Sequence, residues 1–163
     1  MKLVLFGLGA AIVAAGLFCG LWLTSRNTSE AEIDNSLANE APEVREVATE
    51  IVELLVNVDA AKLEATGERV LELSTGNFRS DYESLLPGLG PAFEEAGART
   101  TGEIVEGPDV TFSASDEAFA IAKVAQTIQV DNDERIVGFT VRLTMIIEGD
   151  EWKADRFELL GEL

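Results

Sequence analysis

Residues 137–148, VGFTVRLTMIIE, decide the fold because apolar side chains recur there at every second position. This alternation is typical of a β-strand that buries one face and exposes the other. The apolar set comprises Val137, Phe139, Val141, Leu143, Met145 and Ile147. The sequence therefore predicts a long strand with a single core-facing side.

Two further strands precede this one and another follows it. Alternating or apolar runs place them at residues 103–114, 118–130 and 152–160. The loops at 131–134 and 148–151 have the length of hairpin turns, so consecutive strands should pair antiparallel. The predicted sheet is a meander of four strands.

Irregular positions in this meander predict a strongly bent sheet. Gly107-Pro108 interrupts the first strand, where we expect a bulge or bend. The strand at 118–130 has no clear apolar side, which indicates either burial on both faces or another bulge. A further bulge is expected in the strand at 152–160. A sheet bent in this way can wrap around a helix as a cone.

The region before the strands has helical periodicity. Apolar residues spaced by three or four from Val44 to Val58 predict a first helix. Pro42 suits a first turn and is its expected start, although Ile33 and Leu37 could begin a helix that continues into the domain. Asp59 is the expected cap of a second helix, which Gly76 should terminate.

A third helix should follow, capped by Thr75 or Asn77. Its apolar stripe runs from Phe78 through Tyr82 to Phe93. The segment 87–91, PGLGP, should kink or break this helix, leaving a short second piece over 91–96. Three helices followed by four strands predict an α+β domain with the helices packed on one face of the sheet.

The N-terminus predicts a membrane anchor. The 21 residues from Leu3 to Leu23 carry no charge, and as a helix they would span roughly 31 Å, the thickness of a bilayer core. A cleaved signal peptide is the alternative, although its apolar region is usually shorter and ends in a small-x-small site. Gly16 and Gly20 form a GxxxG pair suited to close packing of membrane helices.

The chain therefore divides into an anchor at 1–25, a polar acidic linker at 26–42 and a domain at 43–163. Lys2 precedes the anchor and only Arg26 follows it closely, which favours a cytoplasmic N-terminus and an extracytoplasmic domain. We expect a single-pass protein of the cell membrane.

Charge and composition exclude several classes of function. Residues 26–163 hold 11 basic and 30 acidic residues, a net charge of −19 that repels nucleic acid and anionic lipid head groups. The chain has no histidine and one cysteine, so a Cys/His zinc site and an internal disulfide are both excluded. No cofactor or metal site is predicted.

Two short motifs carry a resemblance. Residues 75–82, TGNFRSDY, stand at the turn into the third helix, and residues 149–152, GDEW, stand at the last hairpin. With the anchor, linker and meander, they resemble the Mce-associated membrane proteins of actinobacteria. The resemblance implies a soluble domain of the nuclear transport factor 2-like, or SnoaL-like, cone fold.

The resemblance also implies an accessory role. Members of that family are thought to associate with and stabilise Mce complexes that import lipids or sterols, and no catalytic residues are carried over from them. We expect the motif positions to have structural roles; these are Thr75, Gly76, Phe78, Tyr82 and Trp152.

Other functions fit the same layout. The cone could bind a lipid or small hydrophobic ligand, with a lining drawn from Leu89, Phe93, Phe139, Val141 and Leu143. The inner-membrane scaffold of type IV secretion systems has the same arrangement of anchor and cone. A ketosteroid isomerase-like enzyme would need Tyr82 and a carboxylate, but the adjacent Asp81 and Glu83 should point away from it. We therefore expect a protein that is not an enzyme.

Overall fold

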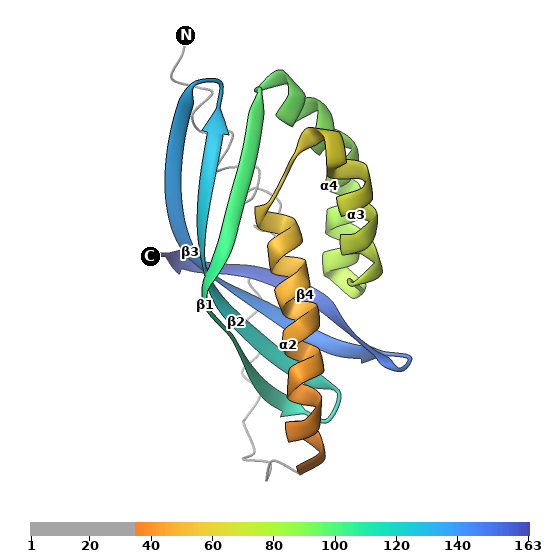
Figure 1. The fold of residues 1–163 in the computed structure, drawn as a ribbon. Helices are drawn as coiled ribbons and strands as arrows, with labels where there is room; N and C mark the ends of the chain where they lie inside the picture. The colour runs from red at the N-terminus through yellow and green to blue at the C-terminus, as the bar shows by residue number, and fades with distance from the viewer. Residues whose placement is uncertain (1–34) are drawn as a thin grey trace.

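The computed structural model describes residues 35–163, in which a layer of helices packs against a four-stranded antiparallel sheet (Figure 1). The helical part comprises α2 (Asn35–Val56), the 3-10 helix η1 (Ala60–Lys62), α3 (Leu63–Glu72) and α4 (Gly76–Glu95). The sheet comprises β1 (Ala98–Ala114), β2 (Glu117–Val130), β3 (Asp133–Glu148) and β4 (Glu151–Glu162), in that spatial order. The predicted α+β meander is confirmed.

The predicted anchor at 1–25, with its Gly16 and Gly20 pair, lies outside the described residues. Between residues 35 and 163, no helix has the length and apolarity to cross a membrane. The first helix starts earlier than expected, because α2 begins at Asn35 and contains Pro42 in its interior. Pro42 is exposed, so water can bond the carbonyl that loses an N–H partner. The prediction that this helix begins at Pro42 is therefore wrong.

Strand β2 buries one face only. Its core-facing positions are Ala118, Ala120, Ala122, Val124, Gln126 and Ile128. Its pairing with β3 is unbroken from Glu117 to Val130. The expectation of burial on both faces or of a bulge in this strand is wrong, because small alanines on one face hid its apolar side. These alanines leave room for α2 to pack closely on the sheet.

The bulges lie in the two edge strands. In β1 the register shifts on both sides of Glu106, which confirms the irregularity predicted at Gly107-Pro108. In β4, Asp155 and Leu160 have no partner in β3, so the predicted bulge in the last strand is also confirmed. Extra residues on the edge strands bend the sheet, and Figure 1 shows its upper half turned away from its lower half, with α2 in front of the lower half.

The core lies between α2, α4 and the concave face of the sheet. From α2 it takes Val44, Ala48, Ile51, Val52 and Val56, and from β3 it takes Phe139, Val141, Leu143 and Met145. Burial of each of the larger apolar side chains contributes roughly 1.5–3 kcal/mol, so this face of α2 secures the helix to the sheet.

Helix α4 is continuous from Gly76 to Glu95, so the predicted break at Pro87 and Pro91 is wrong. Both prolines are exposed, where water can satisfy the carbonyls that they leave without N–H partners. The apolar stripe of α4 packs on the opposite side and holds the helix together. Gly97, with φ +55°, follows the helix as expected.

Candidate functional site

The turn between α3 and α4 is fastened to β4. The N–H of Thr75 donates to the Ala154 carbonyl at 2.8 Å, and the N–H of Ala154 donates to the Leu73 carbonyl at 2.9 Å. Thr75 stands before α4, but its hydroxyl donates to Glu148 Oε1 at 2.6 Å and does not cap the helix. Gly76 begins α4 with φ +51°. This part of the TGNFRSDY motif joins the helical layer to the edge of the sheet.

Aromatic side chains of the two motifs fill the interior beside that turn. Phe78 stacks on Phe157 with ring centroids 5.9 Å apart. The centroids of the Phe78 and Tyr82 rings lie 6.0 Å apart, and those two rings are tilted. Trp152 meets Phe112 edge-on at 5.8 Å. Phe78, Tyr82 and Trp152 are all buried, so they act as packing residues in this structure.

The polar residues around Tyr82 lie apart from its hydroxyl. Asp81 and Glu83 are exposed, and Arg79 donates from Nη1 to the Leu71 carbonyl. Burial raises the pKa of the Tyr82 hydroxyl above its ordinary value, which keeps the phenol neutral. The structure thus gives Tyr82 no paired acid or base from its own helix.

The side chains named as a cavity lining are largely packed into the core. Phe93, Phe139, Val141 and Leu143 are each at most 6% exposed, and Leu89 is half-buried. Together they occupy the space between the helices and the sheet.

Polar residues of the strands also have structural partners. Lys123 pairs with Glu106, and Arg142 pairs with Glu158 at 2.7 Å while lying over the Phe119 ring. These two cations stand on the convex face of the sheet, away from the core.

Gln126 lies on the concave face and bonds the end of α2. Its Nε2 donates to the Val56 carbonyl at 2.9 Å, and the Thr100 hydroxyl donates to the same oxygen at 3.0 Å. Asn57 then exchanges hydrogen bonds with the backbone of Gly102. The C-terminus of α2 is therefore satisfied by groups from the sheet.

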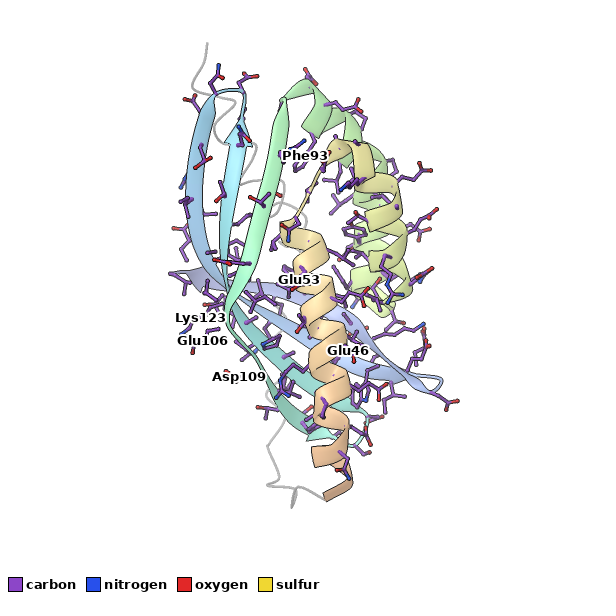
Figure 2. The ribbon with its side chains drawn as sticks, viewed as in Figure 1. Glu46, Glu53, Phe93, Glu106, Asp109 and Lys123 are labelled. Atoms are coloured by element: carbon purple, nitrogen blue, oxygen red, sulfur yellow. The ribbon has the colours of Figure 1, made fainter. Side chains whose placement is uncertain are left out.

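A surface groove of about 580 Å³ lies between α2, the α3–α4 turn and the start of β4. Its floor is apolar and its rim is charged. The floor comprises Val47, Leu73 and Trp152, and the rim comprises Glu43, Glu46, Glu50, Arg69, Glu72, Arg79, Glu151 and Lys153. A second, shallow depression of about 490 Å³ lies along α2 itself, and its lining comprises Pro42, Arg45, Glu46, Thr49, Glu50 and Glu53. Figure 2 shows Glu46 and Glu53 on α2.

The basic residues of the 580 Å³ groove are already engaged. Arg69 contacts both oxygens of Glu50, at 2.6 and 2.9 Å, and reaches Glu72 at 3.0 Å. The hydrogen bond from Arg69 lowers the pKa of Glu50, against a smaller opposing effect of burial. Lys153 lies 3.4 Å from Glu148 and 3.6 Å from Glu151.

This groove was not predicted from the sequence. The signal was present on α2, where Glu43, Glu46, Glu50 and Glu53 are spaced by three or four residues and so share one helical face. The other walls come from segments distant in sequence, and their approach to α2 depends on the tertiary fold.

Comparison with solved structures identifies the fold. An IcmL-like type IV secretion system protein from Legionella pneumophila aligns with a TM-score of 0.62 at 9% identity, covering 75% of this chain and 92% of that one. The VirB8 protein of Agrobacterium tumefaciens aligns with a TM-score of 0.60 at 17% identity, covering 76% and 93%. An NTF2-like protein with a cystatin-like fold from Novosphingobium aromaticivorans aligns with a TM-score of 0.53 at 18% identity, covering 79% and 90%.

These likenesses establish the fold only. Sequence identities below one fifth do not show that two proteins share an activity or a binding partner. No family model matches the sequence, and no curated protein matches it significantly. The resemblance to Mce-associated proteins therefore rests on the two motifs and on their order after the predicted anchor and linker. The described part of the chain, residues 35–163, has the nuclear transport factor 2-like fold, and similar structures include proteins of type IV secretion systems.

Proposed function

We propose that this protein is a membrane-tethered scaffold whose domain binds other proteins of a cell-envelope complex and performs no catalysis. The observation that carries the proposal is the filled interior. The side chains expected to line a ligand chamber, among them Phe139, Val141 and Leu143, are packed against α2. Recognition would then take place on the outer surface of the domain.

Two further observations support this proposal. The uncharged run from Leu3 to Leu23 has the length of a membrane span. The fold likeness to the IcmL-like protein and to VirB8 extends over three quarters of the chain. An anchor followed by such a domain holds a binding surface close to the membrane.

The identity of the complex is a separate question. The motifs at 75–82 and 149–152 favour an Mce-type lipid import complex, whereas the fold likeness favours a secretion-type assembly. We take a membrane protein complex as the proposal and leave the Mce partner as a prediction from the motifs. A lipid-binding domain is less favoured, because its expected lining is largely buried.

Cross-linking in native membranes tests the scaffold. A photo-reactive amino acid is placed in turn at exposed positions on each face of the domain, and the captured proteins are identified by mass spectrometry. We expect repeated capture of the same membrane proteins from one face. Capture of nothing but the protein itself at every position would contradict the proposal. Lipid that co-purifies stoichiometrically with the extracted protein would favour the lipid-binding alternative.

A further inference from the structure

We propose that the 580 Å³ groove between α2, the α3–α4 turn and β4 is the site at which this scaffold binds a basic segment of a partner protein. The occupant is a short stretch of chain with two lysine or arginine residues and one apolar side chain. The inference rests on the proposed scaffold function and specifies where and how the partner binds.

The rim has an excess of negative charge. Five carboxylates face three cations, and the cations already have partners: Arg69 with Glu50 and Glu72, Lys153 with Glu148 and Glu151, and Arg79 with the Leu71 carbonyl. Among the described residues, Glu43 and Glu46 have no ion pair within 4.0 Å. These two exposed carboxylates are therefore the groups that a partner cation would meet.

The floor of the groove gives the partner an apolar contact. Val47 and Leu73 are half-buried beside Trp152, which is 3% exposed. A side chain of moderate size placed there would cover apolar surface, as the centre of a protein interface does. The charged rim around this floor would exclude an acidic segment and orient a basic one.

The walls of the groove are firmly positioned. Thr75 and Leu73 are hydrogen-bonded to Ala154 in β4, and the two contacts of Arg69 with Glu50 join α3 to α2. A partner would therefore meet a preformed surface, which lowers the entropic cost of binding. The neighbouring surface of α2 continues to Glu53, and its one cation, Arg45, donates to the Pro108 carbonyl, so the carboxylate of Glu53 remains open to a basic segment.

A binding measurement with a defined probe tests the groove. The full chain is placed in nanodiscs of neutral phosphatidylcholine, with empty nanodiscs as the blank. The probe is a fluorescent 14-residue peptide that carries two lysines and a single leucine among alanines and glutamines, and a peptide with two glutamates in place of the lysines is the control. We expect the lysine peptide alone to bind, with an affinity that falls as ionic strength rises.

Matched variants separate the groove from the general acidity of the protein. The double substitution Glu43→Gln/Glu46→Gln should weaken binding of the lysine peptide by about three- to tenfold. The control, Glu94→Gln/Glu95→Gln, removes the same charge from exposed positions at the far end of α4, near the Phe93 label in Figure 2, and should change binding by less than about twofold. Equal losses in both variants, or no loss in either, would overturn the groove as the site.

Cross-linking distinguishes the groove from the scaffold function itself. A photo-reactive residue at Glu151, on the groove rim, should capture a partner peptide whose sequence contains at least two lysines or arginines. The same residue at Glu94 should not capture that peptide. Capture of partners only from positions away from the groove would overturn the groove and preserve the scaffold. Capture of no partner from any position would contradict both the groove as the binding site and the scaffold function.

Discussion

The side-chain amide of Gln126 donates to the backbone carbonyl of Val56 across 2.9 Å, although 70 residues separate them in sequence. Val56 is the last residue of α2, so its carbonyl has no partner within the helix. The buried hydroxyl of Thr100 bonds the same oxygen at 3.0 Å. The sheet therefore supplies the C-terminal cap of the helix that packs on it.

Replacing Gln126 should destabilise the fold. Gln126→Leu leaves the Val56 carbonyl with Thr100 as its remaining side-chain donor in a buried site, and we expect a loss of about 1–2 kcal/mol in the free energy of unfolding. Urea unfolding followed by circular dichroism measures it. The exposed Gln129 on the same strand is the control, and Gln129→Leu should change stability by less than about 0.5 kcal/mol. Equal effects of the two substitutions would contradict this role of Gln126.

Two glycines of α4 should respond to alanine in opposite directions. Gly76 has φ +51°, and a Cβ atom there would collide with the Asp155 carboxylate, so Gly76→Ala should cost about 1–2 kcal/mol. Gly88 lies inside the helix, and a Cβ there would meet nothing within 4 Å, so Gly88→Ala should stabilise the protein by up to about 1 kcal/mol. Thermal unfolding of the two variants measures both effects. A Gly76→Ala variant more stable than the natural protein would contradict the requirement for glycine at position 76.

Glu148 should make stability depend on acid pH. Its pKa is lowered from 4.5, first by the hydrogen bond from Thr75 and then by Lys153. A lowered pKa in the folded state stabilises the protein above pH 4.5, and this contribution disappears as the pH falls through the folded-state value. Thr75→Val should therefore move the pKa of Glu148 back towards 4.5 in an NMR titration.

The comparison must be made between variants. Protonation at acid pH also relieves repulsion among the 30 acidic residues. This effect stabilises the folded protein and opposes the loss of the Glu148 contribution. We expect the stability difference between the natural protein and Thr75→Val to be largest near neutral pH and to shrink below about pH 4.5. A difference that stays constant from neutral pH to pH 3 would show that the hydroxyl does not act through the Glu148 carboxylate.

Tyr82 is the only tyrosine, so the absorbance of tyrosinate reports on it alone. Burial raises its pKa above 10.0 in the folded protein, whereas the unfolded chain should titrate near that value. A raised pKa stabilises the protein below pH 10.0, and the contribution is lost as the pH rises through the folded-state value. Tyr82→Phe should remove this alkaline loss. A midpoint at 10.0 in the folded protein would show that burial does not disfavour the charged phenolate.

Local patterns were enough to predict most of the elements. The alternation at 137–148 and the spacing of apolar residues from Val44 to Val58 require only that one face of each segment be buried. Turn-length loops then determine antiparallel pairing. The predicted break in α4 was wrong because only local helix propensity was considered, and this propensity disfavours Pro87 and Pro91. Burial of Phe78, Tyr82 and Phe93 on the opposite face outweighs that cost.

The sequence by itself determined the class of fold, the excess of acidic charge and the uncharged N-terminal run, because each follows from composition or a short period. Only the tertiary structure decided where the charges act. It brings Glu46 of α2, Arg69 of α3 and Lys153 of β4 to the rim of one groove, and it places Gln126 at the end of α2. A local sequence period cannot predict such contacts. They form between segments distant in sequence, and their geometry depends on how the sheet bends against the helix.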